Sequence, residues 1–153
     1  MPNTYTQIHL HAIFAVKNRA SLIDSGWRGD LYRYVGGIIR NQGNKALAIG
    51  GIADHVHILF GLRAPHSVSY IMQHIKGAAS FWVNQEKLTK GKFEWQSGYG
   101  AFSYAKSQIP VVTRYIENQE KHHQKRGFIT EYKNILKKFD VEHDDKSIFY
   151  NVN

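Results

Sequence analysis

The order in which two hydrophobic periodicities alternate along the chain constrains its fold more than any other feature of the sequence. Strict alternation of apolar and polar residues, with a period of two, predicts a β-strand over residues 5–17. Apolar residues at helical spacing then run from Trp27 to Ile39, and Gly43 ends the predicted helix. The chain therefore begins with a strand that leads into an amphipathic helix.

The middle of the chain repeats this order with one strand added. Two short strands are predicted at 45–50 and 52–62, with Gly50-Gly51 as the turn between them. An amphipathic helix follows, and Ser67 is its predicted N-cap. A strand near 99–106 completes the second unit. The sequence thus predicts the order strand, helix, strand, strand, helix, strand.

Two further helices are predicted after the last strand. Pro110 opens the first, because a proline in the first turn of a helix sacrifices no hydrogen bond, and this helix runs to about residue 126. A second helix and a charged tail occupy about residues 129–153. The sequence contains no repeat, low-complexity tract or Pro/Ser-rich linker, so a single domain over 1–153 is the predicted organisation.

This order predicts an α+β fold of the ferredoxin-like or RRM-like kind, an antiparallel sheet with helices on one face plus an additional C-terminal helix. Alternation places the apolar sides of the first and third strands against the two helices. The opposite sides of those strands carry four histidines, His9, His11, His55 and His57. A sheet face that is rich in histidine is unusual, and the chemistry is predicted to lie there.

Composition restricts the classes of function. The chain has 20 Lys+Arg against 12 Asp+Glu, a net charge of +8. Such an excess suggests a polyanionic partner such as nucleic acid, but it is also explained by simple solubility, so the motifs have to decide between the two. It has no cysteine, so disulfides and thiolate metal sites are excluded. No window approaches the roughly 20 apolar residues that span a bilayer, so no membrane association and a cytoplasmic location are expected.

The segment His55-Val56-His57 is a candidate metal site. Because it lies inside a predicted strand, both imidazoles point to the same side while Val56 enters the core. Two adjacent imidazoles can hold one divalent cation, although histidines in a purely structural role also explain such a pair. Asp54 precedes the pair and points away by alternation, which favours a supporting role for its carboxylate.

Tyr115 and Gln119 form a second candidate pair on the predicted helix that Pro110 opens. A separation of four residues places them on one helical face, one turn apart. Tyr115 borders the apolar stripe without occupying its centre, which suits a hydroxyl that faces a cleft. A half-buried tyrosine with no chemical role is the competing interpretation.

Together these residues resemble the HUH endonucleases and, more closely, the single-tyrosine transposases of minimal insertion sequences. Their His-hydrophobe-His strand is matched by His55-Val56-His57 and their Tyr-x-x-x-Gln helix by Tyr115 to Gln119. The resemblance covers nearly the whole chain. Its other matching segments are Val16 to Arg19, Asp54 to His57, Lys76 to Ser80, Trp95 to Ser103 and Tyr115 to His123.

The resemblance implies a DNA transposase that acts on single-stranded DNA with hairpin structure. Tyr115 would attack a phosphate and form a covalent 5′-phosphotyrosine, which stores the energy needed to rejoin the strand. A divalent metal, Mg²⁺ or Mn²⁺, on His55, His57 and Gln119 would stabilise the charge that develops on the phosphate. These three neutral ligands would leave the cation's charge uncompensated. The family also implies a homodimer in which the tyrosine helix of one subunit completes the His pair of the other.

Several further residues are candidates for DNA contact or for support of the metal ligands, and each has an equally simple structural interpretation. Aromatic side chains near the fourth strand could stack on unpaired bases or belong to the core. The candidates are His9, His11, Lys76, Trp95, Tyr99, Phe102, Tyr104, His122 and His123, together with the basic run Lys121, Lys125, Arg126, Lys133, Lys137 and Lys138.

Two other functions stay open at the level of sequence. A domesticated relative would carry out the same chemistry on repeated genomic hairpins instead of mobilising its own element. A nucleic-acid-binding module of ferredoxin-like shape would lack catalysis, but the presence of Tyr115, Gln119 and both histidines argues against it.

Overall fold

A four-stranded antiparallel sheet is the centre of the molecule, and the order of its strands is β2-β3-β1-β4. The computed structural model describes residues 3–63, 65–123 and 127–144. Within them the strands are β1 (His9–Ala15), β2 (Lys45–Ile52), β3 (His55–Gly61) and β4 (Gly100–Tyr104). The order of elements is the predicted one, and the predicted α+β, ferredoxin-like class is confirmed.

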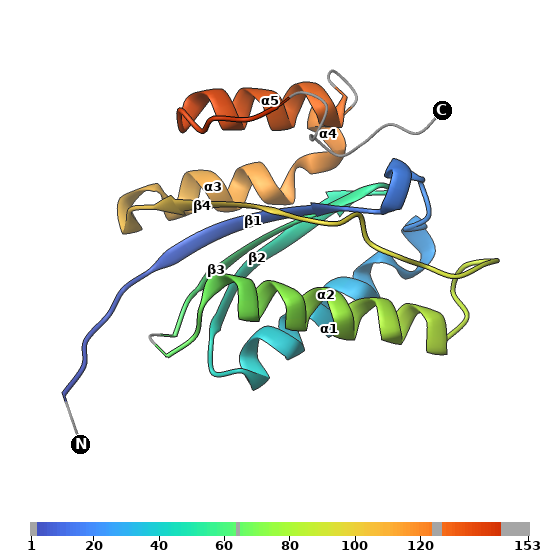
Figure 1. Cartoon of the computed structure of the whole chain (residues 1–153), viewed down its shortest axis with the longest axis horizontal. Coiled ribbons are helices and arrows are strands. Elements are labelled where there is room, and N and C mark those ends of the chain that lie inside the picture. Colours follow the sequence, from blue (N-terminus) through green and yellow to red (C-terminus); the bar gives the residue numbers. More distant parts are fainter. Residues whose placement is uncertain (1–2, 64, 124–126, 145–153) are drawn as a thin grey trace.

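Helices cover both faces of this sheet (Figure 1). The helices α1 (Ser25–Asn41) and α2 (Val68–Gln85) lie on one face, as predicted. The opposite face is covered by α3 (Ile109–Glu117), α4 (Gln119–His123) and α5 (Phe128–Lys138). The C-terminal helices are therefore not an appendage, because they bury the sheet face that carries the histidines.

The face toward α1 and α2 contains the larger hydrophobic core. Alternate residues of β1 and β3 enter it, among them Phe14, Ile58 and Phe60, each fully buried. Side-chain caps fix where the two helices begin: Asp24 accepts from the N–H of Gly26 and Ser67 from the N–H of Tyr70. The predicted cap of the second helix is thus confirmed.

The turn between β2 and β3 does not lie at Gly50-Gly51, and that prediction is wrong. Both glycines belong to β2, and the turn is formed by Ala53 and Asp54. Gly50 serves a different purpose, since a Cβ at this position would lie 2.2 Å from the carbonyl oxygen of Ile116 on α3. The glycine permits close approach of a helix that is remote in sequence, and local turn signals do not report this.

The tyrosine helix is shorter than predicted. Pro110 lies in its first turn as expected, but α3 ends at Glu117, and Asn118 has φ −102° and ψ 24°. The chain then continues in the short helix α4. Residues 124–126, where the helix was predicted to end, and the tail from residue 145 lie outside the described residues.

Other boundaries differ by a few residues. The first strand begins at His9 instead of residue 5, and short 3₁₀ turns, η1 (Lys17–Arg19) and η2 (Lys106–Gln108), follow β1 and β4. Within the part of the chain that the structure describes, no helix has the length and apolar character needed to cross a membrane.

Candidate active site

Strand β3 places His55 and His57 on the sheet face that α3, α4 and α5 cover. Val56, between them, points into the opposite core, as alternation predicts. Both imidazoles are fully buried, with 0% exposure. A third histidine, His11 on β1, lies beside them, and its ring is stacked on that of His57 with centroids 5.0 Å apart.

Each of the two imidazoles is held from behind through its Nδ1 atom. His55 Nδ1 donates to Asp54 Oδ1 at 2.7 Å. His57 Nδ1 shares a hydrogen bond of 2.7 Å with His11 Nε2. Such partners fix the orientation of an imidazole and direct its other nitrogen to a ligand. Here both Nε2 atoms face the same buried point, and Asp54 and His11 lie behind the imidazoles; a supporting role for them stays a prediction.

The point that both Nε2 atoms face is occupied by the carboxylate of Glu131, which comes from α5. Glu131 Oε1 accepts from His57 Nε2 at 3.2 Å and from His123 Nε2 at 3.2 Å, and it lies 3.5 Å from His55 Nε2. The residue is 5% exposed. Burial alone would raise the pKa of Glu131, but hydrogen bonds from His123, His55 and His57 outweigh it and hold the pKa far below its usual range.

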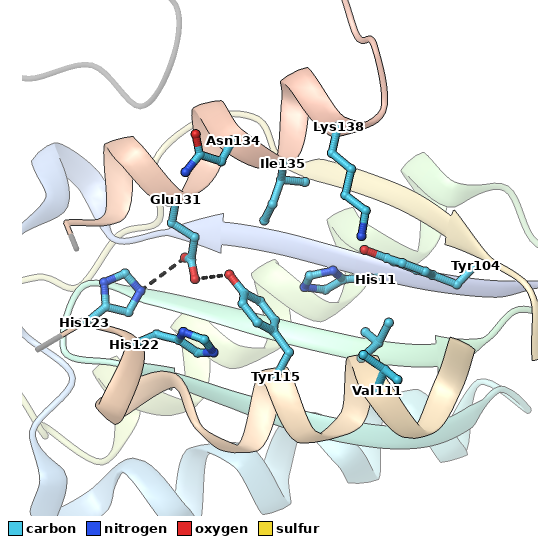
Figure 2. Close-up of a pocket in the computed structure, with 11 residues that line it drawn as sticks. His11, Tyr104, Val111, Tyr115, His122, His123, Glu131, Asn134, Ile135 and Lys138 are labelled. Atoms are coloured by element: carbon cyan, nitrogen blue, oxygen red, sulfur yellow. Dashed lines mark hydrogen bonds and ion pairs between the residues drawn. The ribbon is translucent and has the colours of Figure 1, made fainter. Parts of the chain in front are cut away.

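Tyr115 reaches the same carboxylate from α3. Its hydroxyl donates to Glu131 Oε2 (Figure 2). Its ring lies edge-on to that of His57, with centroids 5.8 Å apart. Partial burial and the nearby charge of Glu131 raise the pKa of Tyr115 above its ordinary value. The phenol is therefore neutral in this arrangement and needs an electrostatic change at Glu131 or at its target before it becomes a nucleophile.

Gln119 completes the cluster although the helix breaks before it. Its Oε1 accepts from His55 Nε2 at 3.1 Å, and its Nε2 donates to Glu131 Oε2 at 3.1 Å. The side chain is 1% exposed. The predicted proximity of Tyr115 and Gln119 is present, since Gln119 Nε2 also donates to the backbone oxygen of Tyr115 at 3.4 Å.

The residues present fit a divalent cation. One ligand atom from each of His55, His57 and Glu131 lies within 4.8 Å of the others, and all three residues are buried. Burial lowers the pKa of His57 to about 4 despite its hydrogen bond to Glu131, which keeps this imidazole in the neutral form that metals require. Burial also opposes protonation of His55, but hydrogen bonds with Asp54 and Glu131 raise its pKa overall. A cation at the site would therefore compete with a proton mainly at His55.

A comparison with protein-family models decides what kind of protein carries this cluster. The model described as "Transposase IS200 like" matches residues 4–119, which include both histidines, Tyr115 and Gln119. The chain belongs to this family. The resemblance inferred from the sequence motifs is thereby confirmed, and with it a DNA-processing enzyme of the transposase class.

Solved structures agree on the fold. A candidate transposase from Deinococcus radiodurans R1 superposes with a TM-score of 0.61 at 22% identity, over 78% of this chain and 95% of the other. A REP-associated tyrosine transposase bound to a REP hairpin superposes with a TM-score of 0.59 at 14% identity, over 80% of this chain and 73% of the other. No curated protein sequence matches the chain.

The candidate active-site groups of this IS200-like transposase meet within one chain. The resemblance implied that the tyrosine helix of one subunit completes the His pair of another. In the structure α3 packs on its own sheet at Gly50, and Tyr115 shares Glu131 with His55 and His57 of the same chain. Formation of a homodimer stays a prediction, but a shared site is not needed to bring these groups together.

The structure brings some of the other predicted residues to the cluster and leaves others outside. His123 contacts Gln119 and Glu131, and the ring of His122 lies 4.6 Å from that of Tyr115. By contrast, Lys76 lies on α2, on the other side of the sheet, and donates to the carbonyl oxygens of Gln96 and Gly98.

Trp95 and Tyr99 have structural contacts on the α2 side of the sheet. Trp95 donates from its indole to the backbone oxygen of Lys76 and packs against Phe14, and Tyr99 packs at the margin of the same core. His9 is partly exposed and lines a surface hollow with the N-terminal segment. Lys125 and Arg126 lie outside the described residues. Among the described residues, Trp95, Tyr99 and His9 have no contact with the cluster.

Glu131 is the residue that sequence reasoning missed. The available signal was its place on the buried side of an amphipathic helix, between Phe128 and Tyr132, where an acidic side chain needs a partner. Its presence also changes the expected charge of the site. Three neutral ligands were predicted to leave the cation uncompensated, whereas the structure supplies one carboxylate among the imidazoles.

Proposed function

We propose that this transposase cleaves and rejoins single-stranded DNA through Tyr115. The phenolic oxygen attacks a phosphodiester phosphorus, the bond from phosphorus to the 3′ oxygen breaks, and the products are a 5′-phosphotyrosine and a strand with a free 3′-hydroxyl. Attack by a 3′-hydroxyl on the phosphotyrosine reverses the step and rejoins DNA without an external energy source. One observation carries the proposal: the hydroxyl of Tyr115 and both imidazole Nε2 atoms converge on one buried carboxylate.

The chain's own residues would prepare this step. Glu131 accepts the hydrogen bond from the Tyr115 hydroxyl and orients it, and over the whole step the phenolic proton passes to the departing 3′ oxygen. Gln119 orients that carboxylate through its amide, while Asp54 and His11 hold the two imidazoles in place. Burial of the cluster excludes water, which would otherwise hydrolyse the phosphotyrosine.

We further propose that His55, His57 and Glu131 hold a divalent cation, with Gln119 as an additional oxygen donor. When bound, Mg²⁺ or Mn²⁺ would supply positive charge to the phosphate in the transition state. The mixed imidazole and carboxylate set suits Mn²⁺ well, since imidazole is a poor ligand for Mg²⁺. One carboxylate lowers the net charge of the site to about +1, which still favours a phosphate.

Single strands with hairpin structure are the proposed substrate. The net charge of +8 supports a nucleic-acid partner, and one structural neighbour is bound to a REP hairpin. Mobilisation of the chain's own element and processing of repeated genomic hairpins share this chemistry.

The direct test is formation of a covalent adduct. Wild-type protein is incubated with labelled single strands from the flanks of its own gene, with Mn²⁺ or with EDTA, and separated under denaturing conditions. We expect an adduct that requires the metal and that maps to Tyr115 by mass spectrometry. Absence of any adduct on these strands, or an adduct on another residue, contradicts the proposal.

A further inference from the structure

A cavity of about 280 Å³ opens beside the Tyr115 hydroxyl, between α3 and α5. Figure 2 shows residues of α5 on one side of it, residues of α3 on the other, and His11 and Tyr104 of the sheet between them. None of the groups that the proposed cleavage uses fills this space, which extends from the nucleophile toward the end of β4. A cavity adjoining a candidate nucleophile is the place where the rest of its substrate would lie.

The walls of the cavity suit a flat, largely apolar ring. Tyr104 is half-buried and presents its ring at the inner side, where it packs against Phe139. Val112 of α3 and Ile135 of α5 line the cavity, and Val111, which also lines it, is 60% exposed. An exposed valine at such an edge loses water when a ring enters, which favours binding.

The rim adds polar groups of the kinds that a nucleotide requires. Asn134 on α5 carries an amide, which offers both a donor and an acceptor to the edge of a base. Lys138 lies one turn further along α5, with its Nζ 5.6 Å from the centre of the Tyr104 ring. A cation at this position can contact a phosphate or stack with a base over the same ring.

We propose that this cavity, named here the base pocket and defined by Tyr104, Val111, Val112, Asn134, Ile135 and Lys138, holds one unpaired nucleobase adjacent to the phosphate that Tyr115 attacks. The inference rests on the proposed function, because it assigns a place to the substrate of that site. The base would stack on Tyr104, and Asn134 would read its edge. The pocket would thereby fix which phosphate reaches the Tyr115 hydroxyl, so it is a specificity site.

The test is an abasic scan combined with pocket variants. Single strands from the gene's flanks are made with one abasic nucleotide at each unpaired position, and their Kd values are measured with Tyr115→Phe protein, so that binding is read without cleavage. We expect one position at which the abasic nucleotide weakens binding by about tenfold, the scale of one stacked base. In protein that also carries Tyr104→Leu, the same nucleotide should cause little further loss.

Matched controls separate the pocket from general effects. Phe81→Ala, an exposed aromatic on α2 on the opposite side of the sheet, should leave the abasic penalty unchanged. Lys138→Ala should weaken binding more than Lys137→Ala, which removes the same charge from the same helix outside the pocket. Asn134 is exposed, so Asn134→Ala should not impair folding. We expect this variant to discriminate less among the four bases at the nucleotide identified by the abasic scan, so that their Kd values differ less than in the parent protein.

The outcomes distinguish this proposal from the function on which it rests. If no abasic position depends on Tyr104 or Asn134, the base pocket is wrong, whether or not the wild type cleaves DNA. If the dependent position exists but cleavage maps several nucleotides away from it, its assignment next to the attacked phosphate is overturned. Failure of the wild type to form any adduct would contradict the proposed cleavage while the binding scan still tests the pocket.

Discussion

The two faces of the sheet differ in what they bury. The face toward α1 and α2 is filled by large apolar side chains such as Phe14, Ile58 and Phe60, each fully buried. The face toward α3, α4 and α5 buries five polar or charged side chains among its apolar ones: His11, His55, His57, Gln119 and Glu131. Burial of such groups costs free energy unless they are paired, and here the pairing is nearly complete.

This difference indicates that the face toward α1 and α2 mainly stabilises the fold, whereas the face toward α3, α4 and α5 holds the candidate active site. A core built only for stability gains little from buried ionisable groups, because well-packed apolar residues are usually at least as favourable. The second face accepts that cost in order to hold imidazoles, a carboxylate and a phenol together. Neighbouring residues of one strand therefore have different roles. Substitutions on the first face should mainly lower the free energy of unfolding, and substitutions on the second should mainly impair metal binding and cleavage.

The largest effect is expected for Tyr115→Phe. Removal of the hydroxyl removes the nucleophile, so adduct formation should fall by at least about a thousandfold. The unfolding transition and hairpin binding should change little, since the ring is retained. Gel separation of labelled adduct measures adduct formation. Thermal unfolding measures the stability of the fold, and a binding titration measures hairpin affinity. An adduct that persists on another tyrosine would disprove the assignment.

His57→Ala and Ile58→Ala compare the two faces directly, since these residues are adjacent in β3. His57→Ala should weaken Mn²⁺ binding by more than about a hundredfold and abolish metal-dependent cleavage. Ile58→Ala should lower the free energy of unfolding by about 2–5 kcal/mol and leave cleavage by the folded fraction intact.

Calorimetric titration with Mn²⁺ and urea unfolding give the two readouts for both variants. The comparison fails if Ile58→Ala weakens Mn²⁺ binding as much as His57→Ala does. It also fails if wild-type protein keeps full cleavage activity in EDTA.

Gly50→Ala tests whether the contact between α3 and β2 positions the tyrosine. A methyl group there would meet the carbonyl oxygen of Ile116, so α3 must shift, and small displacement of a reacting group can reduce rates by up to about a hundredfold. Gly37→Ala on α1 is the matched control, because a Cβ there meets nothing within 4 Å. Single-turnover cleavage by both variants is the measurement, and equal rates would mean that the contact has no positioning role.

The smallest effect is expected for Gln119→Ala. Water can replace a neutral amide oxygen at a metal, and Glu131 keeps its contacts with His57 and His123, so Mn²⁺ affinity should fall by about tenfold. Glu131→Gln, which removes a charge and preserves the shape, should weaken Mn²⁺ binding more than Gln119→Ala does. The reverse order in a calorimetric titration would show that Gln119 and not Glu131 is the dominant ligand.

Local sequence patterns predicted much of the face toward α1 and α2, but they predicted less of the face toward α3, α4 and α5. Alternation in β1 and β3 predicted which residues meet α1 and α2, and Ser67 was found as a cap, because these features depend on neighbours in the chain. The histidine face was found in the same way. Its other components required contacts between residues far apart in sequence.

Three particular errors show this limit. Gly50 was interpreted as a turn residue because its true reason, the approach of Ile116, lies 66 residues away in the sequence. The break at Asn118 has no glycine or proline to announce it. Glu131 was not singled out, because its histidine partners on β3 and α4 come next to it only when α5 packs over them. The family resemblance supplied His55, His57 and Tyr115, and the site shared between subunits that it implies stays a prediction.

The most direct test of the account is whether one chain supplies both the histidines and the tyrosine. Tyr115→Phe protein and His57→Ala protein, distinguishable by size, are unfolded together, refolded as a mixture and given labelled substrate with Mn²⁺. Any adduct must form on the His57→Ala chain, since only it retains Tyr115. If each site is completed within one chain, we expect no adduct above the level of the separate variants. Clear labelling of the His57→Ala chain would show that its tyrosine uses the histidines of another chain, which contradicts a site completed within one.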